Sequence, residues 1–210
     1  MISTGIPGPA YRVRTRRLVL RCWEPADAEA LNAAIDASLE HLRPWMPWAN
    51  DEPADLQARI ERLRSWRGQF DLGQDFVYGV FSLDEREVLG SSGLHTRAGE
   101  GAREIGYWIH VNHINQGLAT EVAAALTRVA FEIEAVVRVE IHCDPRNLRS
   151  AAVARKLGFV HEATLRQRTQ DAEGQRRDTM IWSMLAEDYT GSVASTVEIE
   201  AFDAVRRRIL

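Results

Sequence analysis

The sequence predicts an α+β fold, a mixed α/β arrangement in which helices flank a central twisted mixed sheet of about seven strands. Several short stretches alternate apolar and polar residues, which is the period of a half-buried strand, and longer stretches repeat apolar residues on one helix face. The segments follow in the order β, α, α, βββ, α, β, α, ββ. A strand, a helix and a strand at residues 103–111, 117–133 and 136–143 imply a right-handed parallel crossover within that sheet.

Residues 15–188 are expected to form one domain. A chain of 210 residues can bury one sizeable core but is short for two full domains, and its 45% hydrophobic and 27% charged residues are ordinary for a folded, water-soluble protein. Residues 1–14 are rich in glycine and proline without periodicity and are expected to be a flexible leader. Residues 189–210 are expected to be a C-terminal tail.

The first strand is expected at residues 16–23, where apolar and polar residues alternate. Two helices follow it, with apolar residues at helical spacing at Leu31, Ile35, Leu39 and Leu42 and again at Leu56, Ile60, Leu63 and Phe70. The loop between the helices carries Trp45 and Trp48 among prolines. This loop either plugs the core or forms a wall of a substrate site.

Residues 76–83, 88–96 and 103–111 are expected to be three strands of an antiparallel meander, because turn-rich segments separate them. A helix then begins at Gly117, because apolar residues recur at helical spacing after it. A strand is expected to follow this helix at residues 136–143.

A short helix is expected at residues 147–157, with Asn147 as its N-cap and Gly158 as its C-terminal stop. Residues 159–168 and 177–185 then close the domain as two strands around a turn.

The tail carries the pattern of one more helix. Ser195 to Glu198 has the spacing of a capping box, and apolar residues at 197, 202, 205 and 209 could line one face of a final helix. Such a helix could dock on the body of the domain or on a second subunit, which would make the protein a homodimer.

Composition and cysteine spacing exclude several classes of function. The net charge of −4 argues against a broad nucleic-acid-binding surface, which needs clustered lysine and arginine. Cys22 and Cys143 follow no metal-ligand spacing, so we expect neither a metal site nor a disulfide framework. No apolar run approaches the roughly 18 residues of a membrane-spanning helix. We therefore expect a cytoplasmic protein with no nucleic-acid or membrane partner.

The helix start at Gly117 has the features of an anion-binding site. The first N–H groups of a helix have no partner within it, and the helix dipole favours negative charge there, so the backbone can hold a pyrophosphate. Gly117 and Ala119 allow a ligand to approach that backbone closely, although a glycine at a helix start also serves ordinary turns.

A second segment runs from Asn147 to Ser150 and ends in Lys-Leu-Gly-Phe at residues 156–159. Together with the order of elements, the two segments resemble the GCN5-related N-acetyltransferase (GNAT) superfamily, in its motif A, Q/R-x-x-G-x-G/A, and its N-x-x-S/A and K-L-G-F segment. Ile114 and Asn115 depart from the usual motif A, whereas Gly117 and Ala119 keep their places. Asn147 and Ser150 can equally be a helix cap and its first-turn neighbour.

Three segments of the sequence point to one branch of this superfamily. Residues 15–21, the loop at 42–48 and the pair Arg177-Asp178 are similar to the Rim-type (RimJ/RimL) branch, which includes enzymes that acetylate the N-termini of ribosomal proteins. The similarity covers roughly residues 15–188 by element order.

The resemblance implies a GNAT fold in which the pantetheine arm of acetyl-CoA lies between two splayed parallel strands, residues 103–111 and 137–143. A backbone N–H near residues 109–111 would polarise the acetyl carbonyl. No metal is expected. The residues expected to bind the cofactor are Ile109, His110, Val111, Gln116, Gly117, Leu118, Ala119, Thr120, Asn147 and Ser150.

Transfer by direct attack needs a neutral amine, yet amines are mostly protonated at neutral pH. A base or a water chain is therefore needed. The resemblance makes Glu104 the first candidate for the base, although it could also be a strand charge paired with an arginine. Many GNAT enzymes have a tyrosine that acts as the general acid at the position that Ala154 occupies here. Ser150 or water is therefore expected to protonate the CoA sulfur. The residues expected to bind the acceptor are Trp45, Trp48, His95, Tyr107 and Asp178.

Three functions remain open from the sequence. The first, which we favour, is acetyl transfer to the N-terminal α-amine of a protein. The second is acetylation of a small amine such as an amino acid, a polyamine or an antibiotic. The third is a non-catalytic module that binds acyl-CoA.

Overall fold

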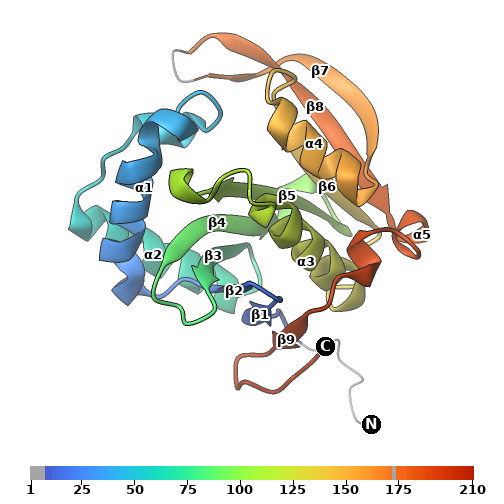
Figure 1. The fold of residues 1–210 in the computed structure, drawn as a ribbon, viewed down its shortest axis with the longest axis horizontal. Helices are drawn as coiled ribbons and strands as arrows, with labels where there is room; N and C mark the ends of the chain where they lie inside the picture. The colour runs from blue at the N-terminus through green and yellow to red at the C-terminus, as the bar shows by residue number, and fades with distance from the viewer. Residues whose placement is uncertain (1–7, 172–173) are drawn as a thin grey trace.

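The computed structural model describes residues 8–171 and 174–210, and in them the chain forms a nine-stranded sheet in the order β7-β8-β6-β5-β4-β3-β2-β1-β9 (Figure 1). The strands are β1 (Arg12–Arg14), β2 (Leu18–Cys22), β3 (Phe76–Ser82), β4 (Val88–His95), β5 (Ala102–Ile109), β6 (Arg138–Cys143), β7 (Val160–Gln170), β8 (Arg176–Leu185) and β9 (Glu200–Phe202). The helices are α1 (Ala28–Leu42), α2 (Leu56–Asp71), α3 (Leu118–Glu132), α4 (Leu148–Leu157) and the short α5 (Ala186–Tyr189).

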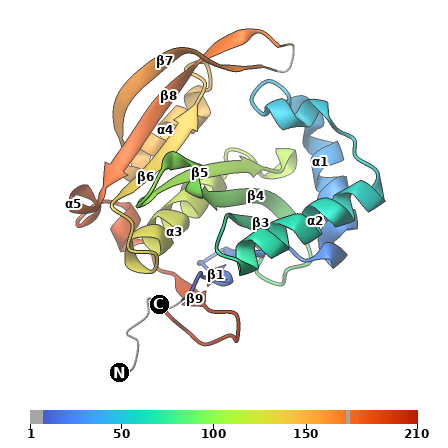
Figure 2. The ribbon, with the colours of Figure 1, turned by 180° about the vertical axis from the view of Figure 1, so that it is seen from behind.

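The helices cover the two faces of this sheet (Figures 1 and 2). On one face α1 and α2 pack on Trp23, Phe81 and Trp108. On the other face α3 and α4 pack on a larger apolar cluster that includes Ile105 and Ile141. The mixed α/β fold, the antiparallel meander β3-β4-β5 and the crossover from β5 through α3 to β6 confirm the sequence prediction.

The leader prediction is wrong for the part of it that is described. Arg12–Arg14 forms β1, which pairs antiparallel with β2 and with β9, and Val13 is fully buried. Residues 1–7 of the predicted leader lie outside the described residues. β1 and β9 account for the two strands beyond the expected seven.

The predicted final helix is also wrong. The tail instead forms β9 and a turn that Asp203 closes, because its carboxylate accepts hydrogen bonds from the backbone N–H groups of Val205 and Arg207. The N–H of Ile209 then returns to the carbonyl of Ala201 at 2.8 Å. Asp203 thus offers the backbone an alternative to a helix.

The feature that positions the site is the divergence of β5 from β6. Parallel pairing covers only Ala102, Arg103 and Glu104 of β5, opposite Arg138, Val139 and Glu140 of β6. Beyond that point β5 continues along β4 to Ile109, while β6 continues along β8 to Cys143. The sheet therefore splits, as the resemblance implied.

The loop between α1 and α2 is held by a buried ion pair. Arg59 of α2 is 1% exposed, and its guanidinium donates to Glu52 Oε2 at 2.5 Å and to Asn32 Oδ1 of α1 at 2.6 Å. Glu52 lies in the loop, so a single guanidinium joins the loop to both helices.

Replacing Arg59 with leucine should destabilise the fold by about 3 to 5 kcal/mol, because Glu52 keeps a buried charge without its main partner. Denaturant unfolding followed by circular dichroism measures the change. Arg64→Leu is the matched control, because Arg64 on the same helix pairs with Glu61 in an exposed ion pair and should change stability by no more than about 1 kcal/mol. Equal effects of the two substitutions would contradict the role of Arg59.

Candidate active site

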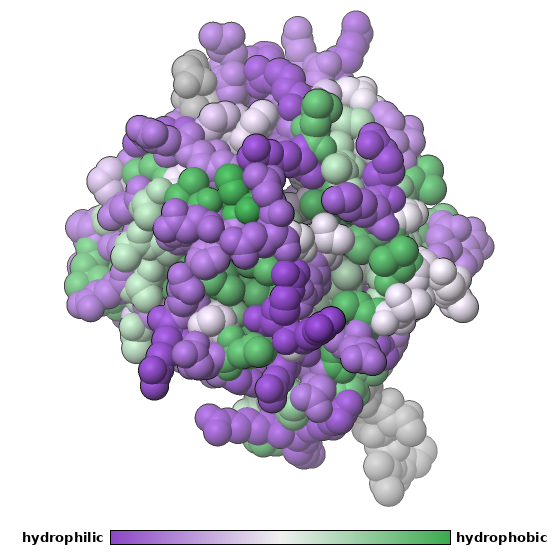
Figure 3. Space-filling model, in the orientation of Figure 1, coloured by the Kyte–Doolittle hydropathy of each residue, from purple (hydrophilic) through white to green (hydrophobic). Residues whose placement is uncertain are grey.

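A cleft of about 1760 Å³ opens where the sheet splits. Its lining includes residues of α1, α2 and the loop between them, of β3 to β8, of the start of α3 and of α4. Polar side chains cover most of the face shown in Figure 3, with apolar side chains exposed between them. Of the residues predicted from the sequence, the cleft brings together Trp45, Trp48, His95, Glu104, Tyr107, Ile109, Gly117, Leu118, Ala119, Thr120, Asn147 and Ser150.

The start of α3 has the backbone shape that an anion site needs. Gly117 is the N-cap with φ 78°, and Asn115 is also left-handed with φ 61°. Leu118, Ala119 and Thr120 follow in the first turn, where N–H groups lack partners within the helix. Gln116 does not line the cleft, because its side chain donates to the carbonyl of Asn112.

Arg17 braces this loop from the outside, which the sequence analysis missed. Its guanidinium donates to the carbonyl of Gln116 at 3.0 Å and to the carboxylate of Glu121 at 2.6 Å. The contact spans about a hundred positions in the chain, so only the packing of β2 beside α3 could reveal it. Arg17 thereby neutralises Glu121, which lies in the first turn of α3, at the end of the helix where an anion would bind.

The backbone of β5 presents alternate N–H groups to the split. The N–H of His110 donates to the carbonyl of Leu89 at 2.8 Å, which directs it towards β4. Because N–H groups along a strand alternate between its two edges, those of Tyr107 and Ile109 face the gap beside β6. The N–H of Val111 is occupied by Ser38 Oγ at 3.1 Å. Of the three predicted positions, only Ile109 therefore offers a donor to the gap, and neither His110 nor Val111 lines the cleft.

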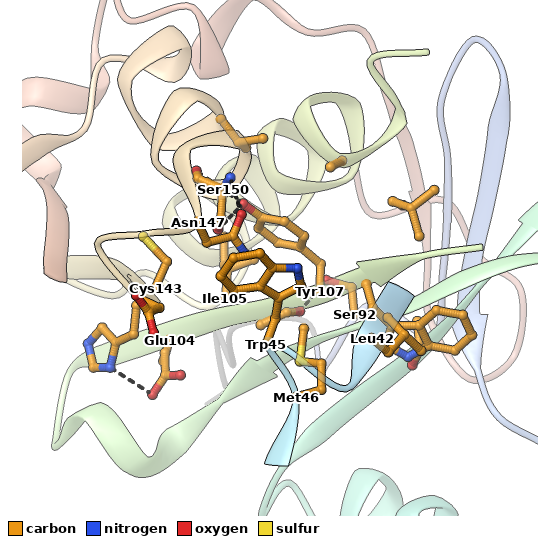
Figure 4. A pocket seen from close by; sticks show the side chains of 18 of the residues that line it. Leu42, Trp45, Met46, Ser92, Glu104, Ile105, Tyr107, Cys143, Asn147 and Ser150 are labelled. Atoms are coloured by element: carbon orange, nitrogen blue, oxygen red, sulfur yellow. Dashed lines mark hydrogen bonds and ion pairs between the residues drawn. The ribbon is translucent and has the colours of Figure 1, made fainter. Parts of the chain in front are cut away.

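Ser150 and Tyr107 meet across the cleft (Figure 4). The Ser150 hydroxyl lies 3.0 Å from the Tyr107 phenol oxygen, while the Ser150 N–H donates to Asn147 Oδ1 at 3.1 Å. The cap prediction for Asn147 is confirmed. Burial raises the pKa of Tyr107, so its phenol stays protonated. The Tyr107 phenol thus reaches towards α4, where it contacts Ser150.

Position 154 could not hold the family's usual tyrosine without a change in the core. Ala154 is fully buried among the apolar residues beneath α4. The phenol nearest to Ser150 comes instead from β5, through Tyr107.

The carboxylate of Glu104 is not free. Glu104 is 8% exposed, and both of its oxygens accept hydrogen bonds from Arg97, at 2.7 and 2.5 Å. His142 Nδ1 lies 3.5 Å from the same carboxylate. Burial alone would raise the pKa of Glu104, but the hydrogen bonds from Arg97 and the charge of His142 outweigh it, so the pKa lies below its ordinary value. Such a carboxylate is a weak base.

His95 is paired with Asp75, a partner that the sequence did not suggest. His95 Nδ1 lies 2.9 Å from Asp75 Oδ2, and both residues line the cleft. Burial alone would raise the pKa of Asp75, but the hydrogen bonds from His95 and from the N–H of Thr96 outweigh it. The pKa of Asp75 therefore lies below its ordinary value, and the carboxylate stays ionised.

Two tryptophans form the wall of the cleft opposite α4. Trp48 packs on Trp108 with ring centroids 6.3 Å apart, and the carbonyl of Trp45 accepts a hydrogen bond from Arg177 Nη2 at 3.1 Å. Arg177 of β8 therefore connects the two sides of the split. Asp178 points elsewhere, because its carboxylate accepts from the N–H of Gln167 outside this cleft.

Within residues 8–171 and 174–210, histidines, cysteines and carboxylates form no group of three or more that could hold a metal ion. Across the same described residues, none of the helices combines the length and the apolar character needed to cross a membrane.

Comparison with known proteins identifies the family. Residues 17–160 match the family model of the acetyltransferase (GNAT) domain. The ribosomal protein uS5-alanine N-acetyltransferase of Escherichia coli (strain K12) is 28% identical, over 87% of this chain and 94% of that protein. An uncharacterized N-acetyltransferase p20 of Bacillus licheniformis is 30% identical, over 84% of this chain and 97% of the relative.

Solved structures agree with these relatives. Mycobacterium smegmatis RimJ in complex with CoA-disulfide superposes with a TM-score of 0.77 at 25% identity, covering 91% of this chain and 95% of that one. A probable acetyltransferase of the GNAT family from Chromobacterium violaceum has a TM-score of 0.71 at 29% identity, with the same coverage. The split sheet, the helix start at Gly117 and these matches lead to one conclusion: the chain is an acyltransferase that belongs to the GCN5-related N-acetyltransferase family, in its Rim-type branch.

Proposed function

We propose that this chain transfers the acetyl group of acetyl-CoA to the N-terminal α-amine of a protein, with ribosomal proteins as the substrate class. The observation that carries the proposal is the split between β5 and β6, which directs backbone N–H groups into a cleft beside the start of α3. The substrate class follows the uS5-alanine N-acetyltransferase of Escherichia coli. Acetylation of ribosomal proteins would place the chain in the cytoplasm.

The residues of the split fit acetyl-CoA, which GNAT enzymes use. The N–H groups of Leu118, Ala119 and Thr120 lie in the first turn of α3 and can hold the pyrophosphate without a cation. When bound, acetyl-CoA supplies a thioester carbonyl that an amine can attack. The N–H groups of Tyr107 and Ile109 are the donors that can stabilise the negative charge on that carbonyl oxygen.

The hydroxyls of Ser150 and Tyr107 are suited to protonate the departing sulfur. They lie 3.0 Å apart at the edge of the gap, and a pair of hydroxyls can pass a proton from one to the other. Asn147 fixes the first turn of α4 and with it the position of Ser150. Glu104 and Arg97 border the opposite side, where the acceptor amine would enter.

The acceptor is tested by measuring acetyl-CoA turnover against N-terminal peptides of ribosomal proteins, polyamines and aminoglycosides. We expect a ribosomal N-terminal peptide to give the highest kcat/KM, with the acetyl group on its α-amine by mass spectrometry. Acetylation of small amines alone would overturn the substrate class. Binding of acetyl-CoA without transfer to any amine would overturn the enzymatic proposal.

Gly117→Glu should weaken acetyl-CoA binding by roughly tenfold or more, because a carboxylate repels the pyrophosphate and a side chain at this left-handed position costs about 1 to 2 kcal/mol. Isothermal titration calorimetry measures the affinity. Gly191→Glu is the matched control, because Gly191 has φ 87° and open space around it. Wild-type binding should persist in a chelator, and a requirement for a divalent ion would contradict the backbone cradle.

Ser150→Ala should lower kcat by about 10²-fold, at the lower end of general acid–base effects, with the melting temperature nearly unchanged. The stability should hold because Ser150 contributes its N–H, not its hydroxyl, to the cap made by Asn147. Tyr107→Phe should lower kcat similarly, and the double variant should lose no more than the larger single effect if the two hydroxyls act as one relay. Unchanged turnover in both single variants would remove them from the chemistry.

A further inference from the structure

We propose that His95, oriented by Asp75, is the residue that accepts the proton of the attacking amine. The inference rests on the proposed acetyl transfer and assigns to the same site a base that differs from Glu104. Three features of the structure carry it: the position of the imidazole, the hydrogen bond to Asp75 and the engagement of Glu104 by Arg97.

The imidazole lies over a floor of two glycines. Gly93 of β4 and Gly106 of β5 are directly opposite one another, and a Cβ at Gly93 would come within 2.5 Å of His95 Nε2. A Cβ at Gly106 would lie 3.4 Å from the same nitrogen. The absence of side chains at this pair therefore makes the room in which the ring sits.

This position directs Nε2 towards the reacting end of β5. His95 is opposite Glu104, so a ring that folds over the next pair, Gly93 and Gly106, points along the strands towards Tyr107 and Ile109. The N–H groups of those two residues face the gap between β5 and β6. The imidazole thus approaches the gap from the face of the sheet that carries α1 and α2, opposite the Ser150–Tyr107 pair.

Asp75 sets which nitrogen is available. Its carboxylate accepts from His95 Nδ1 at 2.9 Å and from the N–H of Thr96 at 3.3 Å. A carboxylate at Nδ1 keeps the proton of the neutral ring on that nitrogen and leaves Nε2 as an acceptor. Among the described residues no protein group hydrogen-bonds Nε2, and the His95 side chain is 18% exposed to the cleft.

Four charged or titratable groups lie around His95. Asp75 precedes β3, Arg97 follows β4, and Glu104 lies on β5 with His142 of β6 behind it. Arg97 and Glu104 neutralise each other through two hydrogen bonds. Beside Gly106, the carboxylate of Glu104 is therefore engaged by Arg97. The His95 ring is instead oriented by Asp75, and its Nε2 has no partner among the described residues.

The step balances without a further reactant. The amine nitrogen attacks the thioester carbonyl carbon, a C–N bond forms, and the C–S bond breaks with its electron pair on sulfur. The proton lost by the amine goes to His95 Nε2. The CoA thiolate takes a proton from the Ser150–Tyr107 pair. Between turnovers the imidazolium returns its proton to solvent, and the hydroxyl pair regains one proton from solvent.

The test compares His95→Gln, Asp75→Asn and Glu104→Gln with the wild type, using whichever amine the wild type acetylates best. We expect His95→Gln to lower kcat by about 10²-fold or more, and Glu104→Gln to lower it by less, while acetyl-CoA affinity stays within a few fold in both. The pH profile of kcat/KM should differ between the wild type and His95→Gln, because the variant lacks the group that takes the proton. His161→Gln on β7, outside the cleft, is the matched control.

Two further measurements separate a base from a packing role. Added imidazole should restore part of the rate of His95→Ala, because the glycine floor leaves a slot for it. Nitrogen-15 NMR of histidine in the CoA-free chain should show the neutral His95 ring protonated on Nδ1, with a shift towards the other tautomer in Asp75→Asn. This second readout does not depend on activity.

The outcomes distinguish this inference from the proposed function. A folded His95→Gln that keeps its rate within a few fold, or a wild-type His95 with its neutral proton on Nε2, overturns the base but leaves acetyl transfer standing. Acetylation of small amines alone overturns the substrate class, and the variants are then compared on that amine. A wild type that acetylates no amine overturns both.

Discussion

The rest of the site depends on one constraint, which is that β5 loses its parallel partner after three residue pairs. Backbone donors inside a protein are almost always paired, so a strand that leaves its neighbour creates a demand for hydrogen bonds that a ligand can meet. The sheet tolerates this opening because β5 stays paired with β4 from Glu104 to Ile109, and β6 stays paired with β8 from Arg138 to Cys143. The two halves are therefore each held firmly while the space between them remains accessible.

The surroundings of the split are organised by hydrogen bonds from three arginines. Arg17 braces the start of α3, Arg59 holds the α1–α2 loop, and Arg177 joins that loop to β8. Each guanidinium has several donors in a rigid fork and can bind a carboxylate and a carbonyl at once. The cleft thus gains fixed walls without being filled by apolar side chains, which leaves room for both reactants.

Much of the fold followed from local pattern, and the failures have a common cause. Alternation predicted β2 and the meander, and Asn147 and Gly158 marked the ends of α4, because these signals reside in neighbouring residues. β1 and β9 are three residues each and exist only because they pair with one another and with β2. The His95–Asp75 pair depends on the register of β3 against β4, and Val111 lost its free N–H to Ser38, a residue of α1. No spacing in the sequence encodes such contacts.

The alternation of side chains along β5 has a consequence for how this site could change. Glu104 and Gly106 face α1 and α2, whereas Ile105 and Tyr107 face α3 and α4. A one-residue insertion early in β5 would exchange the two faces for every later position. The phenol would move to the amine side, and a side chain would replace the glycine beneath the imidazole. Substitutions can therefore tune this enzyme gradually, but a change of length within β5 would invert its active site in a single event.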